Sequence, residues 1–138
     1  MMQTVLTYLS FLITSMLLHG QNTIEVTMTH FDSNEGIVKV GLYNAEGTFL
    51  ERPYKALSAE ISEEKATVIF SEVPDGIYAI SCYHDEDRSG SLNMFMGMIP
   101  TESYGTSNNA PSRFGPPKWE DASFEVTGGV VRKLEIKL

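Results

Sequence analysis

The chain has 138 residues, 18 acidic and 10 basic side chains, and a formal net charge of -8 at pH 7. This length suits one domain, and the negative charge argues against nucleic acid as a partner because it repels phosphate backbones. Cys82 is the only cysteine, so no intramolecular disulfide can form. Its place in an alternating apolar segment predicts a buried, inert thiol.

Residues 1–20 carry no charged side chain, and residues 5–18 are apolar except for small or hydroxyl residues and one Tyr. This run matches the core of a secretory signal peptide and is shorter than the ~20 residues that span a bilayer. We therefore expect a signal peptide cleaved after Gly20, no membrane span after cleavage, and a periplasmic or extracellular protein. A buried amino-terminal helix and an uncleaved membrane anchor are the alternatives.

Alternating apolar and polar residues predict about seven short strands in the remaining chain, residues 21–138. They fall at residues 24–29, 38–43, 54–61, 66–70, 76–83, 122–126 and 130–138. We expect the first two strands to form an antiparallel pair, and the last two to form a closing hairpin through Thr127-Gly128-Gly129. With no clear helix, the pattern indicates a single antiparallel Greek-key β-sandwich of the immunoglobulin or transthyretin-like kind.

Two further segments have a distinct local character. Asp75-Gly76-Ile77-Tyr78 is similar to a tyrosine corner, in which a Tyr hydroxyl bonds back to the preceding turn. Residues 94–118 show no sustained period and are punctuated by Gly and Pro, which predicts a long loop or flap. Its aromatic residues Tyr104 and Phe114 suggest that the flap packs onto the domain.

The segment after the central strand is spaced like a calcium loop. Oxygen-bearing residues stand at relative positions 1, 3, 5, 7 and 9, with Gly90 at position 6 for the sharp turn; they are Asp85, Asp87, Ser89, Ser91 and Asn93. Position 12 is Met96 instead of a bidentate Glu, which predicts weak Ca²⁺ binding. Asp121, beside Glu120, would complete the site. The alternative is a polar turn without metal.

Two further sets of residues bear on metal binding and on catalysis. Met94, Met96 and Met98 alternate near His84, and thioethers suit copper(I), so a secreted copper-binding sandwich is one alternative. An apolar lining by these Met side chains is the other. Ser107 lies in the segment Gly105-Thr106-Ser107-Asn108-Asn109, which lacks the second Gly of a nucleophile elbow. Glu102 and Glu120 would serve an uncharacterised hydrolase as an acid–base pair, but no catalytic constellation is recognisable and we expect no enzyme.

Several runs together resemble a known family. They are Gly76-x-Tyr78, His84-Asp85-Glu86-Asp87, Pro100-x-Glu102-x-Tyr104-Gly105-x-Ser107-Asn108-Asn109, Phe114-Gly115-Pro116-Pro117 and Glu120-Asp121-Ala122. The chain resembles the secreted bacterial family called domain of unknown function 2141. The resemblance implies export and a sandwich similar to transthyretin-like or carboxypeptidase-regulatory domains, and it implies no established function. Asn93 departs from it, since typical members have Asp there.

We therefore expect an exported, non-catalytic binding or structural module with a weak calcium site in its acidic loop. Its partner would be a protein or a carbohydrate at the cell envelope. The resemblance and the polar composition of the flap indicate a partner or ligand surface made of His84, Glu102, Tyr104, Ser107, Asn108 and Asn109. The alternative is that the flap only covers an open sheet edge.

Overall fold

The computed structural model describes residues 21–92, 94–95, 99–112 and 114–138. The expected signal peptide lies outside these residues, as do Asn93, Met96 and Met98. Within the described ranges, no helix has the length and apolar character needed to cross a membrane.

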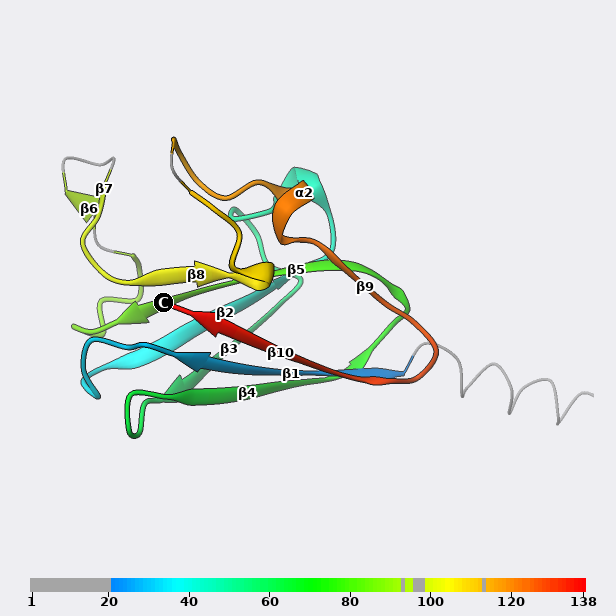
Figure 1. Cartoon of the computed structure of the whole chain (residues 1–138), viewed down its shortest axis with the longest axis horizontal. Coiled ribbons are helices and arrows are strands. Elements are labelled where there is room, and N and C mark those ends of the chain that lie inside the picture. Colours follow the sequence, from blue (N-terminus) through cyan, green and yellow to red (C-terminus); the bar gives the residue numbers. More distant parts are fainter. Residues whose placement is uncertain (1–20, 93, 96–98, 113) are drawn as a thin grey trace, which may run out of the picture.

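Two β-sheets pack face to face, which confirms the predicted all-β sandwich (Figure 1). The first sheet has the order β10-β1-β4 and contains β10 (Val131–Lys137), β1 (Asn22–Thr29) and β4 (Ala66–Val73). The second has the order β3-β2-β5-β8 and contains β3 (Lys55–Glu60), β2 (Ile37–Tyr43), β5 (Gly76–Asp85) and β8 (Tyr104–Thr106). The Greek-key order stays a prediction.

Short elements surround these sheets. β9 (Phe124–Val126) pairs with the start of β5, and β6 (Met94–Phe95) pairs with β7 (Ile99–Pro100). The helical turns are η1 (Glu46–Thr48), η2 (Ser107–Asn109) and α2 (Trp119–Ala122). The predicted flap is therefore partly regular, because β8 within it extends the second sheet by pairing with β5.

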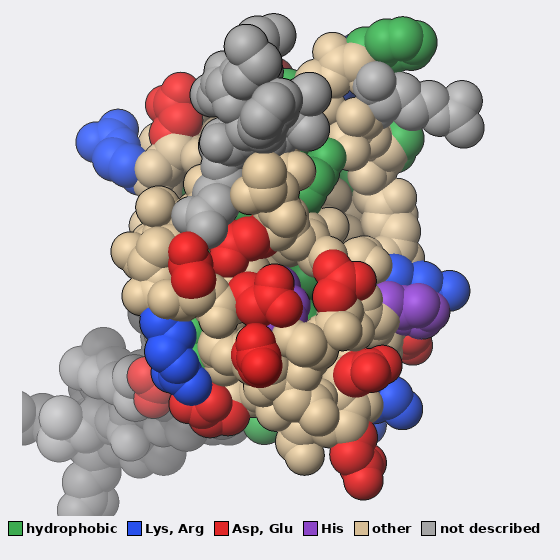
Figure 2. Space-filling model, turned by 90° about the vertical axis from the view of Figure 1, so that its left-hand side faces the viewer, with side chains coloured by type: hydrophobic (Ala, Val, Ile, Leu, Met, Phe, Trp, Pro, Cys, Tyr) green, Lys and Arg blue, Asp and Glu red, His purple; other side chains and the backbone are tan. Residues whose placement is uncertain are grey.

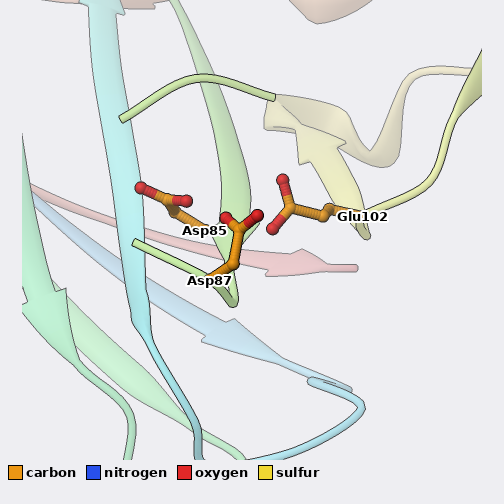
Figure 3. Close-up of side chains that lie close together, drawn as sticks. All are labelled: Asp85, Asp87 and Glu102. Atoms are coloured by element: carbon orange, nitrogen blue, oxygen red, sulfur yellow. The ribbon is translucent and has the colours of Figure 1, made fainter. Parts of the chain in front are cut away.

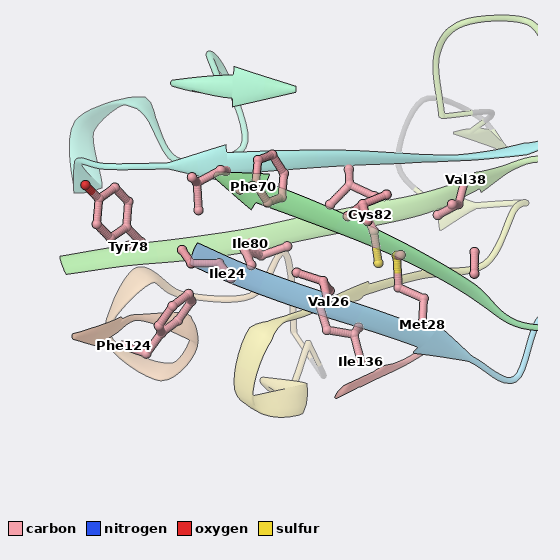
Figure 4. Packing of buried hydrophobic residues seen from close by; sticks show 14 of the residues in the cluster. Ile24, Val26, Met28, Val38, Phe70, Tyr78, Ile80, Cys82, Phe124 and Ile136 are labelled. Atoms are coloured by element: carbon pink, nitrogen blue, oxygen red, sulfur yellow. The ribbon is translucent and has the colours of Figure 1, made fainter. Parts of the chain in front are cut away.

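The core lies between the sheets and follows the predicted alternation (Figure 4). Ile24, Val26 and Met28 of β1 are fully buried, while the residues between them are half-buried. Phe70 of β4 and Ile80 of β5 meet them from the neighbouring strand and from the facing sheet. Each strand thus buries one face, which is the stabilising arrangement for a two-layer sandwich.

Both predicted hairpins are wrong. The strands at residues 24–29 and 38–43 belong to different sheets, and β9 and β10 also separate. β10 instead runs parallel to β1, from the pair Thr23 and Val131 to the pair Thr29 and Lys137. Alternation reveals which face of a strand is buried but not which strand lies beside it, so the turns at 30–36 and 127–130 cross between layers.

The central strand β5 begins with the predicted tyrosine corner. The Tyr78 hydroxyl donates a hydrogen bond to the Pro74 carbonyl at 2.7 Å, which ties the strand to the turn before it. Further along, Cys82 is fully buried, as predicted, and this burial raises the pKa of its thiol to about 12. A thiol held in its neutral form in the core is chemically inert.

Candidate metal-binding loop and flap

Three carboxylates converge where β5 ends. Asp85, Asp87 and Glu102 each place one carboxylate oxygen within 4.8 Å of the others (Figure 3). The sheet register explains the meeting: Tyr104 of β8 lies opposite Tyr83 of β5 in an antiparallel pair, so Glu102, two residues before Tyr104, comes level with Asp85. Asp85 and Glu102 are buried, whereas Asp87 is exposed.

The loop folds around the buried Asp85. Its carboxylate accepts hydrogen bonds from the backbone N–H groups of Ser89 at 2.9 Å and Gly90 at 2.8 Å. The Glu102 carboxylate accepts one from the backbone N–H of Glu86 at 2.8 Å. The backbone N–H of Ser89 also donates to the third carboxylate at 3.1 Å. Backbone donors thus hold all three carboxylates in place, and charge-assisted bonds of this kind are among the stronger ones.

Gly36 brings the neighbouring loop against the acidic one. Its backbone has a φ of +73°, and a Cβ there would overlap the backbone of Asp85 and Glu86. Ser33 of the same loop donates a hydrogen bond to the Glu86 carboxylate at 2.9 Å. Residues 32–36 have the composition of a turn, but the need for glycine arises from this close approach.

Tyr83 is a second residue that the sequence did not reveal as part of the site. Its hydroxyl donates a hydrogen bond to the Gly90 carbonyl at 3.0 Å and so holds the glycine turn of the loop. Partial burial raises the pKa of Tyr83 above its usual value, and the negative charges of Asp85 and Glu102 add a smaller increase.

Asp and Glu side chains gather on the end of the sandwich where these loops meet (Figure 2). The loop after β1, the turn after β3 and the loop after β5 all contribute, and hydrogen bonds tie them together: the Asn34 amide oxygen accepts from the Glu64 backbone N–H at 2.7 Å. Ser103 donates to the Asp32 carboxylate at 2.8 Å. A concentration of one charge sign raises the local concentration of counter-ions, so this end attracts cations.

The expectation that His84 belongs to a partner or ligand surface is wrong, because His84 is buried. The side chain is 1% exposed, its ring packs edge-on against Phe31 at a centroid distance of 5.2 Å, and its Nε2 contacts the Glu35 carbonyl. Strand alternation explains the burial, because His84 shares the inward face of β5 with Cys82. The described residues do not include Met96 and Met98, and copper(I) binding stays a prediction.

The flap residues predicted to form a surface mostly hold the fold together. Ser107 is fully buried: its hydroxyl accepts a hydrogen bond from the Ile80 N–H at 2.9 Å and donates one to the Ala122 carbonyl. The Asn108 amide donates to the carbonyls of Asp121 and Ser123, at 3.1 and 2.9 Å. The expectation of Ser107 as a surface residue is therefore corrected, because it joins η2 to β5 and to α2.

Asp121 does not reach the acidic loop. It lies in α2, next to Ala122. The Ser107 hydroxyl is hydrogen-bonded both to the Ala122 carbonyl and to the Ile80 N–H, so this end of α2 lies near Ile80. Asp85 lies five residues beyond Ile80 along β5, about 17 Å away at the rise of an extended strand. The expected contribution of Asp121 is thus corrected, since α2 docks halfway along the strand. Glu120 belongs to the same helix and does not join Glu102 as an acid–base pair.

Of the remaining predicted surface residues, Tyr104 and Asn109 line one pocket. Glu102 is buried beside the carboxylates of Asp85 and Asp87. Asn109 also accepts a hydrogen bond from the Lys137 backbone N–H at 2.9 Å, which fixes η2 to β10. The residues of the predicted flap surface therefore do not form one surface. Some hold the fold together, some line a pocket, and Glu102 is one of the three converging carboxylates.

Comparison with known proteins identifies a family. A family model described as an uncharacterized protein conserved in bacteria (DUF2141) matches residues 26–133, from within β1 to within β10. This range includes the second sheet, the acidic loop, the flap and most of the first sheet. No curated protein and no solved structure matches the chain.

Proposed function

The chain belongs to the DUF2141 family of uncharacterized bacterial proteins, as its sequence predicted, and we propose that it is an exported, non-catalytic binding module with a calcium site in the acidic loop. The convergence of the Asp85, Asp87 and Glu102 carboxylates carries the calcium proposal. The charge-free apolar segment at residues 1–20 supports export. We also infer that the two-layer sandwich is of the transthyretin-like kind.

The oxygen atoms at this site suit a hard cation. Ca²⁺ takes about six to eight oxygen ligands from carboxylates, carbonyls and waters. Besides the three carboxylates, the loop offers the Ser89 hydroxyl and the Ser91 carbonyl, which lie 2.8 Å apart. A divalent cation would also offset the repulsion among three carboxylates held this close. Glu102 thus takes the role that the sequence had suggested for Asp121.

The affinity should be modest. A site with three carboxylates, one of them exposed, matches the weaker, extracellular class of calcium sites, with dissociation constants of about 10⁻⁴ to 10⁻³ M. At ~1 mM Ca²⁺, a site with a dissociation constant of ~0.1 mM would stabilise the fold by about 1.4 kcal/mol. This corresponds to an increase of a few degrees in melting temperature for a domain of this size.

The test is thermal unfolding of the purified chain in chelator and in 1 mM Ca²⁺. We expect Ca²⁺ to raise the melting temperature of the wild type, and to raise it less in Asp87→Asn and Glu102→Gln, which remove charge with little change of shape. Glu125→Gln is the matched control, since Glu125 is exposed on β9. Equal melting temperatures in chelator and Ca²⁺, or an undiminished shift in both loop variants, would refute the calcium site.

A further inference from the structure

A second feature with the character of a binding site lies within the flap, where the flap meets the end of β10. It is an open pocket of about 500 Å³, between β8 at the edge of the second sheet, the end of β10 and the chain that follows η2. Its lining consists of Tyr104, Gly105, Thr106, Asn109, Ala110, Ser112, Pro117 and Lys137. This volume lies within the range of small-molecule sites, about 300 to 1,000 Å³.

The pocket is built by close packing at its base. A Cβ on Gly105 would lie 2.7 Å from Ile136 Cγ2 and 2.8 Å from the Lys137 carbonyl oxygen, so only glycine lets β8 approach β10 this closely. On the flap side, the hydroxyls of Tyr104 and Ser112 are 2.7 Å apart and hydrogen-bonded. The walls are therefore fixed from both sides before any ligand arrives, which lowers the entropic cost of binding.

Thr106 supplies an observation that points to a ligand. It lines the pocket and is 2% exposed, and its Oγ1 has no hydrogen-bond partner in the described part of the chain. A buried hydroxyl without a partner destabilises a fold, and valine would fill the same space without that cost. Unsatisfied polar groups of this kind are typical of sites that complete their hydrogen bonds with a ligand.

The polar groups of the lining indicate the chemistry of the ligand. Hydroxyls from Tyr104, Thr106 and Ser112 and the amide of Asn109 suit a small molecule rich in hydroxyl groups, with the Tyr ring as an apolar wall. Lys137 is the cation of the lining and forms no ion pair within the described ranges. It suits one negative charge, whereas the net charge of -8 disfavours polyanions.

We propose that this pocket binds a sugar carboxylate, a uronic acid unit of a carbohydrate, with Lys137 on the carboxylate and Thr106 Oγ1 on a sugar hydroxyl. The proposal deepens the binding role proposed above and is independent of its calcium site. A pocket of this size holds one or two sugar rings, and the expected affinity is weak, with a dissociation constant of ~1 mM or somewhat below.

The test is titration of the ¹⁵N-labelled chain with galacturonate, glucuronate, glucose and acetate, followed by amide chemical shifts in the presence of chelator. Chelator removes Ca²⁺, so failure of the calcium site leaves this test intact. We expect a uronate to shift the amides of residues 104–110, 112 and 137, and to bind at least tenfold more tightly than glucose or acetate. Absence of shifts there, or equal binding of acetate or glucose, would overturn the proposal.

Two variants sharpen the test. Lys137→Met should weaken uronate binding about tenfold, while Lys133→Met, on the same strand and outside the pocket lining, should leave it unchanged. Thr106→Val should weaken binding several-fold and leave the unliganded protein at least as resistant to urea as the wild type. Unchanged affinity in both Lys137→Met and Thr106→Val would overturn the assignment.

Discussion

Replacement of Ser107 by Ala should detach the flap from the sheet at a defined energetic cost. The Ser107 hydroxyl has one proton, which it donates to the Ala122 carbonyl, and it accepts a hydrogen bond from the Ile80 N–H at 2.9 Å. Alanine fits the same space and leaves both backbone groups without this partner. A buried polar group left unsatisfied costs about 1–3 kcal/mol, so for the two groups we expect a loss of about 2–6 kcal/mol.

Urea unfolding measures this loss through two signals. Trp119 is the only tryptophan and lies in α2, so its fluorescence reports the flap contact, while far-ultraviolet circular dichroism reports the sheets. In thermal unfolding, the melting temperature should fall by roughly 8–24 °C, at about 4 °C per kcal/mol for a domain of this size. Ser58→Ala is the matched control, because Ser58 is an exposed strand residue; its effect should stay within about 0.5 kcal/mol. If Ser107→Ala unfolds at the urea concentration of the control, the joining role of this hydroxyl is refuted.

Two further predictions concern β5. Tyr78→Phe removes the hydrogen bond to the Pro74 carbonyl and should lower the free energy of unfolding by about 1 kcal/mol, which urea unfolding measures; an unchanged midpoint would contradict the tyrosine corner as a stabilising contact. Burial raises the pKa of the Cys82 thiol from 9.0 to about 12, so the folded state keeps a proton that the unfolded state loses above pH 9. Stability is therefore fully present below pH 9 and should fall as pH rises from 9 towards 12, by up to about 1.4 kcal/mol per pH unit. The decline should be shallower in Cys82→Ala, and equal slopes in both proteins would contradict the burial effect.

The predicted strands were recognisable from sequence because alternation is a local property. A side chain on every second residue faces the same side of a strand whatever that strand pairs with. Ile24, Val26 and Met28 could therefore be assigned to the core before any neighbour was known. The same holds for the tyrosine corner, whose two partners, Pro74 and Tyr78, are four residues apart.

Strand pairing could not be predicted in the same way. The turn at residues 32–36 has the composition of a hairpin, yet it carries the chain from one sheet to the other. The parallel pairing of β1 with β10 joins the two ends of the domain. Such a contact depends on how both layers close around a shared core, and no short window of sequence contains that information.

The candidate site was also predicted only in part from the sequence. Spacing within one loop was enough to single out Asp85 and Asp87, because they are neighbours in the chain. Glu102 joins them only through the register of β8 on β5, and Asp121 is excluded because α2 docks near Ile80.

The sequence by itself determined the strands and the acidic turn, which depend on residues close together in the chain, and the family, which depends on the order of short runs along it. The tertiary structure decided which carboxylates meet, that Ser107 is buried, and that Thr106 and Lys137 line one pocket. The physical reason is that a site is defined by distances between side chains. Those distances are set by sheet register and layer packing, which sum contacts over the whole domain.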